Sequence, residues 1–159
     1  MTIQIGDKIP HATLNTLKDG VQAVDTDELF AGKKVVLFAV PGAFTPTCSA
    51  KHLPGYADKL GEFEKRGIEV ACLSVNDAFV MDAWAKSQGV PEGVHMLADG
   101  NGAFTQALGL ELDATAFGMG LRAKRFALYA EDGVVKQLHV EAPGEFKVSA
   151  AEYVLEHLA

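Results

Sequence analysis

Cysteine is scarce in this sequence, which has two among 159 residues. Two cysteines cannot build a disulfide scaffold, and a structural zinc site would need about four Cys or His ligands. The five histidines show no metal-ligand spacing, so we expect no metal centre. No C-x-x-C pair is present, which excludes an ordinary dithiol oxidoreductase. We therefore expect both cysteines to be reduced thiols and the protein to be intracellular.

Basic charge and long apolar runs are lacking as well. The formal net charge is −7, so nucleic acid and anionic membranes are poor partners. The longest dense apolar run, Val35 to Val40, is far too short to cross a bilayer. The N-terminal segment shows neither the basic nor the apolar stretch of a signal peptide, and no nucleotide-binding glycine loop is present. We therefore expect a cytoplasmic protein.

The order of strand and helix patterns along the chain indicates the fold class. Three short apolar runs rich in β-branched residues read as buried strands, and amphipathic helices follow each of them. A hairpin with a turn at Glu131 to Gly133 and a final helix complete the chain. We expect one α/β domain over residues 1–159, with a mixed central sheet flanked by helices. A thioredoxin-like fold and other α/β folds are both compatible with this pattern. The expected main strands are residues 34–40, 68–75, 94–98, 126–130 and 134–140.

Local signals predict the ends of the smaller elements. Residues 13–17 fit a short edge strand, and Thr26 is expected to cap a single helical turn. Thr45 is a good N-cap with Pro46 at the first helical position, and Ser149 with Glu152 reads as a capping box. One further helix is expected after Asn76 or Asp77, with apolar Phe79, Val80, Ala83 and Trp84, and another after Asp99 or Asn101. Pro54 should kink the helix that follows Thr45.

Cys48 lies in the first turn of this predicted helix, directly after a core strand. Sites in open α/β sheets form beyond the carboxyl ends of the strands. The free N–H groups and the dipole of a helix N-terminus favour the thiolate form of a cysteine. The Thr45 hydroxyl can bond the sulfur or a substrate oxygen, and Pro41 stiffens the loop. The alternative is that Cys48 is a small buried residue at an ordinary helix start.

Cys72 is predicted to be structural. It lies within the strand 68–75, where a free cysteine behaves as a small core hydrophobe. A direct disulfide with Cys48 is not expected, because Cys72 stands well before the end of its strand whereas Cys48 lies beyond the end of the neighbouring one.

Arg122 and Arg125 are two of the three arginines in the chain and precede the strand at 126–130. A guanidinium there can project over the end of the sheet and stabilise a thiolate and an oxyanion together. A solvated basic cluster is the alternative, more so for Arg122. His52, four residues after Cys48, can orient the cysteine as in a cysteine hydrolase, although an ordinary helix residue is the simpler interpretation.

These residues together resemble the peroxiredoxins. The pattern Pro41-x-x-x-Thr45-x-x-Cys48, with PGAFTPTCSAKHLPGY, ACLSVNDAFVMDAW and LRAKRFALYAEDGVVK in this order, is similar to the type II, or peroxiredoxin-five, subfamily. The resemblance implies a thioredoxin-like fold and thiol-dependent reduction of hydrogen peroxide and alkyl hydroperoxides without metal or flavin. By resemblance Cys48 is the peroxidatic cysteine, Pro41 and Thr45 line its pocket, Arg125 is the catalytic arginine and Arg122 assists more loosely. A homodimer formed near the active-site loop is also implied.

One departure from the subfamily concerns the second half of the reaction. Some members carry a resolving cysteine in the loop before the last helix, where this chain has Ser149. A one-cysteine mechanism recycled by glutathione, glutaredoxin, thioredoxin or another external thiol therefore fits better. Two alternatives remain at this point: a peroxide-sensing binding protein on the same fold, and a cysteine hydrolase that uses Cys48 and His52.

Overall fold

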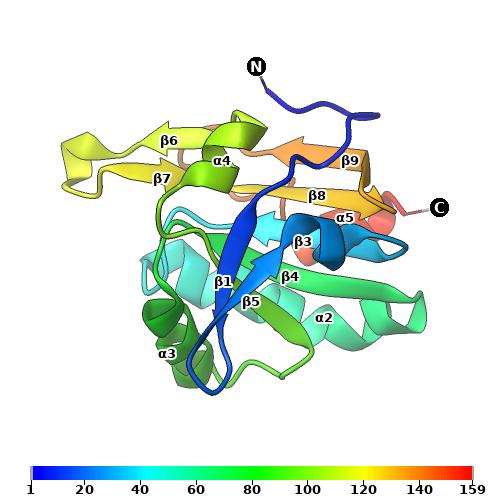
Figure 1. The fold of residues 1–159 in the computed structure, drawn as a ribbon, viewed down its shortest axis with the longest axis horizontal. Coiled ribbons are helices and arrows are strands. Elements are labelled where there is room, and N and C mark those ends of the chain that lie inside the picture. Colours follow the sequence, from blue (N-terminus) through cyan, green and yellow to red (C-terminus); the bar gives the residue numbers. More distant parts are fainter. Residues whose placement is uncertain (1, 159) are drawn as a thin grey trace.

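Seven strands form one twisted mixed sheet, in the order β2-β1-β5-β4-β3-β8-β9 (Figure 1). The computed structural model describes residues 2–158, so Met1 and Ala159, the ends of the expected domain, lie outside the described residues. β3, β4 and β5 run parallel, and the other pairings are antiparallel. The strands are β1 (Thr13–Leu17), β2 (Val21–Asp25), β3 (Lys34–Ala39), β4 (Ile68–Ser74), β5 (Val94–Ala98), β8 (Phe126–Glu131) and β9 (Val134–Val140).

Helices cover both faces of this sheet, as the sequence pattern predicts. One face packs against α2 (Leu53–Lys65), α3 (Ala78–Gln88) and α5 (Ala151–Glu156). The other packs against α1 (Thr26–Phe30) and α4 (Ala103–Leu108). The strands alternate between the two cores: Val36 and Phe38 of β3 face α2, and Val35 and Leu37 face the opposite layer. β3 is almost wholly buried because it lies between two strands and between two helix layers.

The main elements match the prediction. The apolar stripe of α2, the cap of α3 and the glycines that end both helices lie where the sequence predicts them. α2 buries the predicted stripe at three- and four-residue spacing, and Gly67 follows its end with a φ of +73°. The Asp77 carboxylate accepts from the Val80 N–H and caps α3, which Gly89 ends in the left-handed conformation. The predicted stripe in α2 consists of Leu53, Tyr56, Leu60 and Phe63.

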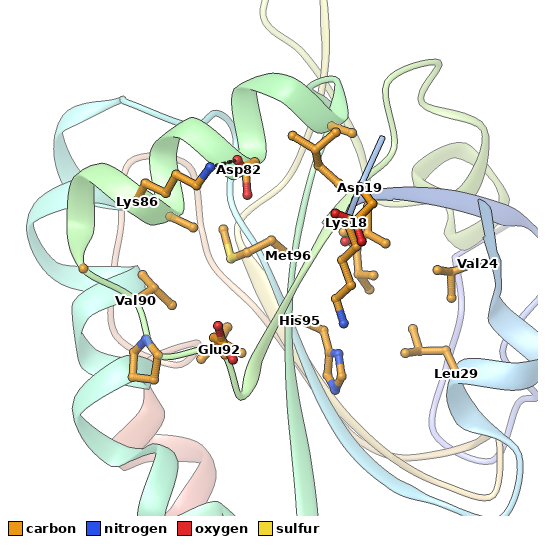
Figure 2. A pocket seen from close by; sticks show the side chains of 18 residues that line it. Lys18, Asp19, Val24, Leu29, Asp82, Lys86, Val90, Glu92, His95 and Met96 are labelled. Atoms are coloured by element: carbon orange, nitrogen blue, oxygen red, sulfur yellow. Dashed lines mark ion pairs between the residues drawn. The ribbon is translucent and has the colours of Figure 1, made fainter. Parts of the chain in front are cut away.

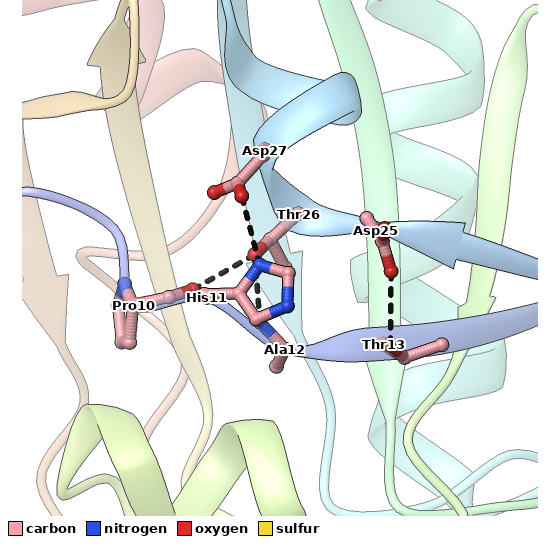
Figure 3. Close-up of polar contacts among 7 residues, drawn as sticks. All are labelled: Pro10, His11, Ala12, Thr13, Asp25, Thr26 and Asp27. Carbon is pink, nitrogen blue, oxygen red and sulfur yellow. Dashed lines mark hydrogen bonds and ion pairs between the residues drawn. The ribbon is translucent and has the colours of Figure 1, made fainter.

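Two predicted caps are wrong for the same reason. Asp25, and not Thr26, is the N-cap of α1; the Thr26 hydroxyl instead donates to the Pro10 carbonyl and accepts from the Ala12 N–H (Figure 3). Ser149 forms no capping box, because its hydroxyl donates to the Glu141 carboxylate at 2.6 Å. In both places the hydroxyl finds a partner distant in sequence.

Three further details differ from the prediction. β1 lies inside the sheet, between β2 and β5, and is not an edge strand. α3 buries Ala78, Met81 and Trp84, while Phe79 is exposed. A small two-stranded sheet, which the sequence did not reveal because both strands have three residues, extends beyond the main sheet in Figure 1; it comprises β6 (Glu111–Asp113) and β7 (Leu121–Ala123), joined through a 3₁₀ turn at Thr115–Phe117.

Across residues 2–158, no helix has both the length and the apolar character needed to cross a membrane.

Candidate active site

Cys48 lies where the chain leaves β3 and enters the helix that precedes α2. The helical backbone begins at Pro46, so Cys48 is its third residue, as predicted. Residues Cys48–His52 form a π-helical turn, in which the Leu53 N–H donates to the Cys48 carbonyl. The disruption expected at Pro54, which has no N–H to donate, takes the form of this wider turn. The Cys48 side chain is fully buried.

The loop between β3 and Cys48 is held by one polar contact of its own and by contacts from two other segments. The Thr45 hydroxyl donates to the Gly42 carbonyl at 2.7 Å, and the Ala43 N–H donates to the Asn76 side chain at 3.0 Å. Arg122 reaches the Pro41 carbonyl at 3.5 Å. Because the Thr45 proton is used within the loop, its oxygen remains an acceptor; no bond from Thr45 to the Cys48 sulfur is present among the described residues.

Arg125 makes the contact on which the electrostatics of the site depend. It directly precedes β8, and its Nη2 donates to the Cys48 Sγ at 3.1 Å. Its Nη1 lies 2.8 Å from the His52 Nδ1. A guanidinium has five N–H donors, so these two bonds leave donors free for a further acceptor beside the sulfur. Arg122 is tied to the Met119 and Pro41 carbonyls instead, which makes it a support of the loop.

His52 is a neutral acceptor for Arg125. Burial, with the nearby Arg125 charge, lowers the pKa of His52 to about 3, although its bond to the Ser149 carbonyl opposes this. Since Arg125 can only donate, the His52 Nδ1 accepts and the Nε2 proton goes to the Ser149 carbonyl, 3.1 Å away. Both ring nitrogens are therefore engaged, one with Arg125 and one with the Ser149 carbonyl, and neither bonds the Cys48 sulfur. The geometry does not support the hydrolase alternative.

Cys72 occupies the interior of β4, paired with Phe38 of β3, and is fully buried. Burial, followed by the nearby Cys48, raises the pKa of the Cys72 thiol well above its ordinary value, with Arg125 opposing. Cys72 is two residues from the end of β4 and belongs to the same buried cluster as Cys48. Both cysteines are free.

We expect Cys72→Ser to retain most of the activity and to lose stability. A protonated, buried thiol is a poor nucleophile, whereas an extra hydroxyl in the core costs about 1–3 kcal/mol. Peroxide turnover and urea unfolding measure the two effects, with Cys72→Ala separating the loss of the sulfur from the burial of the hydroxyl. A folded Cys72→Ser enzyme as inactive as a Cys48 variant would show that Cys72 takes part in the chemistry.

Two of the cavities among the described residues share no lining residue. A cavity of about 220 Å³ borders Arg125, Pro41 and Thr47, with the loop at 141–145 and the apolar Leu112 completing its wall. A larger one, of about 810 Å³, lies between α3, β5 and the β1–β2 turn (Figure 2). Its wall carries both charge signs, with Lys86 paired to Asp82 at 2.8 Å, and no cysteine. The smaller cavity is lined by Arg125, which contacts the Cys48 sulfur, although Cys48 itself does not line it.

Among the described residues, no set of side chains at this site could coordinate a metal ion. Nowhere in residues 2–158 do three or more His, Cys, Asp or Glu side chains gather closely enough to hold a metal ion. The polar groups that surround Cys48 are instead hydrogen-bond donors and their supports.

The structure brings together most of the residues singled out from the sequence. Cys48 and Arg125 are in contact, and Pro41 borders the same cavity as Arg125. What the sequence missed is the link from Arg125 through His52 to Ser149, and the role of Asn76 in holding the loop. The spacing of His52 from Cys48 was a usable signal, although its partner is the arginine and not the cysteine.

Comparisons with known proteins give matches over nearly the whole chain. Residues 4–155 match the family model described as Redoxin. The chain is 52% identical to peroxiredoxin-2E, chloroplastic, of Arabidopsis thaliana, over 99% of this chain and 70% of that protein. A crystal structure of reduced Prx3 in complex with hydrogen peroxide from Vibrio vulnificus is 52% identical, with a TM-score of 0.94 and 98% of both chains covered. The Plasmodium falciparum antioxidant protein, titled a 1-Cys peroxiredoxin, is 28% identical, with a TM-score of 0.88 and 97% of both chains covered.

Proposed function

The chain belongs to the peroxiredoxin family and has its thioredoxin-like fold and peroxidase activity, and we propose that Cys48 is the peroxidatic cysteine. The observation that supports this assignment best is the 3.1 Å contact between the Arg125 guanidinium and the Cys48 sulfur. The guanidinium presents a fixed positive charge to the sulfur, and the thiolate is the form of cysteine that attacks. Residues 1–159 act as one domain, since one continuous sheet separates both cores.

In the first step the Cys48 thiolate attacks one peroxide oxygen in line with the O–O bond. The S–O bond forms as the O–O bond breaks; sulfur loses two electrons to the peroxide, and alkoxide or hydroxide leaves and is protonated. Negative charge moves from the sulfur to the departing oxygen. The free N–H groups of Arg125 stabilise that charge, and the Thr45 oxygen accepts a hydrogen bond from the peroxide O–H.

Substrate reaches the buried sulfur through the cavity beside Arg125. Pro41 and Thr47 border it near the sulfur, and Leu112 and Pro143 give it an apolar wall. Hydrogen peroxide and small alkyl hydroperoxides fit both the size and the polarity of this space. Pro41 limits the access of water to the thiolate.

An external thiol completes the cycle. Cys72 is buried and protonated, and Ser149 stands where a resolving cysteine would lie, so glutathione with glutaredoxin, or thioredoxin, reduces the sulfenic acid. Glutathione attack forms a mixed disulfide and water, and a second thiol releases Cys48. Both cysteines are free thiols, which suits a reducing, cytoplasmic compartment.

Two copies of the chain form a homodimer through the face around the active-site loop. Three phenylalanines are exposed there, Phe44 at 55%, Phe79 at 63% and Phe117 at 82%. Their segments are tied together by the Ala43–Asn76 bond and by the contact of Arg122 with Pro41. Phe44 also holds a φ of +64°, a costly conformation for a bulky residue. Large exposed aromatic groups of this kind are typical of an interface.

Mass spectrometry of the Cys48 peptide tests the one-cysteine cycle. Without thiol, one equivalent of peroxide should add one oxygen, and excess peroxide should drive the sulfur to sulfinic acid and end activity. With glutathione, the peptide should carry a glutathione adduct that glutaredoxin removes. A second measurement compares the rate of peroxide consumption with glutathione plus glutaredoxin to the rate with thioredoxin, and so identifies the reductant. A Cys48–Cys72 disulfide formed at the rate of turnover would refute the one-cysteine cycle, because Cys72 and not an external thiol would then resolve the sulfenic acid, and oxidation without any turnover would indicate a sensor.

A further inference from the structure

Arg125 and Glu141 flank the open end of the β8–β9 hairpin. Arg125 directly precedes β8, Glu141 directly follows β9, and the Glu141 N–H donates to the Arg125 carbonyl at 2.9 Å. The backbone of Arg125 is therefore fixed from the side of Glu141. The guanidinium, at the far end of a long and flexible side chain, needs a separate restraint.

The Glu141 carboxylate organises the loop that supplies this restraint. Its Oε2 accepts from the Ser149 hydroxyl at 2.6 Å, the Ser149 N–H at 2.8 Å and the Lys147 N–H at 2.7 Å. Burial alone would raise the pKa of Glu141, but the bonds from Ser149, Lys147 and Val148 hold it below its ordinary value. At neutral pH the group is an anion that can serve several donors at one oxygen.

These contacts close a ring around the active site. The loop folded over Glu141 turns the Ser149 carbonyl toward His52, 3.1 Å away, and toward the Tyr56 hydroxyl at 2.6 Å. His52 accepts from Arg125 at 2.8 Å, and Arg125 donates to Cys48. The path Arg125–Glu141–Ser149–His52–Arg125 is hydrogen-bonded at every step.

We propose that Glu141 is a positioning residue, which fixes the Arg125 guanidinium against the Cys48 sulfur through Ser149 and His52; this inference rests on the proposed roles of Cys48 and Arg125. An uncharged histidine suits the link, because it orients the guanidinium without neutralising the charge that the thiolate and the leaving oxygen need. The Glu141 carboxylate is linked to the Arg125 guanidinium only through Ser149 and His52. It therefore does not compete with the Cys48 sulfur for the guanidinium N–H groups.

A double-mutant cycle between Glu141 and Arg125 tests this proposal. Trp84, the single tryptophan, donates to the Ser49 hydroxyl beside Cys48, so its fluorescence can follow oxidation of Cys48 in one turnover. We expect Glu141→Ala to slow the peroxide step about tenfold, since a shift of about 1 Å in a reacting group can cost up to a hundredfold. In an Arg125→Ala background the same change should cost less than about twofold. Alkylation of Cys48 at neutral pH should also be slower in Glu141→Ala, and unchanged in Asp99→Asn.

Asp99 provides a matched control. It is a buried carboxylate that also accepts three bonds, from the Phe104 N–H and from the N–H and hydroxyl of Thr105, and it caps α4. Asp99→Asn should lower the melting temperature and leave the peroxide step unchanged. If Glu141→Ala does not fold, the double-mutant cycle is carried out with Glu141→Gln. This change should slow the peroxide step a fewfold in the wild-type background and should not slow it in the Arg125→Ala background.

Additive losses in the two backgrounds would overturn the proposal and leave the peroxidase assignment standing, because they would mean that Glu141 acts on the fold only. An Arg125→Ala enzyme as fast as the wild type would remove the proposed role of Arg125 itself, and the role of Glu141 with it. Coupling between Glu141 and Arg125, together with an unchanged rate in Asp99→Asn, supports the positioning role.

Discussion

Replacing Cys48 with serine is expected to abolish peroxide reduction. A serine hydroxyl is almost wholly protonated near neutral pH, so the attacking anion is lost even though Arg125 still faces the position. The O–O bond then has no nucleophile, since Cys72 is buried and protonated. Peroxide consumption in the presence of glutathione and glutaredoxin should fall to the rate measured without enzyme.

This result needs two controls: the circular dichroism spectrum of Cys48→Ser and the activity of Cys72→Ser. The Cys48→Ser protein should keep the native spectrum, because serine is close to cysteine in size, and Cys72→Ser should turn over. Substantial peroxide consumption by a folded Cys48→Ser protein would require another nucleophile and would refute the assignment of Cys48.

The sequence was sufficient to predict the sheet and the place of Cys48 at the start of a helix because both depend on local signals. The β-branched runs around Val36 and Val70 and the glycine stops fix the alternation of strands and helices. The Thr45-Pro46 start then places Cys48 in the first helical turn. Arg125 was predictable from its position directly before an apolar strand, which leaves its side chain at the end of the sheet.

The polar network around Arg125 was not predictable, because its members lie far apart in sequence. His52 and Arg125 are 73 residues apart, and His52 and Ser149 are 97 apart. Their meeting depends on the β8–β9 register and on the path of the loop after Glu141, neither of which has a local signature. Ser149 was misread as a cap for this reason: the buried Glu141 carboxylate is a stronger acceptor for its hydroxyl than a helix end.

Removal of the Arg125 side chain is expected to slow the peroxide step by a factor on the order of a hundred or more. Arg125 contacts the sulfur directly, and a preorganised donor at a developing charge is typically worth about 3 kcal/mol. Arg125→Lys should also be slow, because a point charge cannot bond the sulfur, His52 and a peroxide oxygen together as a planar guanidinium can. Single-turnover kinetics with limiting peroxide measure the step without interference from the reductant.

The rate of Cys48 alkylation at neutral pH distinguishes this electrostatic role from a packing role. Loss of the guanidinium removes a cation 3.1 Å from the sulfur, so alkylation of Cys48 in Arg125→Ala should be slower. Arg66→Ala, at the exposed end of α2, controls for the loss of one positive charge elsewhere and should change neither the peroxide step nor the alkylation rate. An Arg125→Ala enzyme with wild-type kinetics and a wild-type alkylation rate would mean that the thiolate and the leaving oxygen are stabilised by backbone N–H groups of the π-helical turn alone.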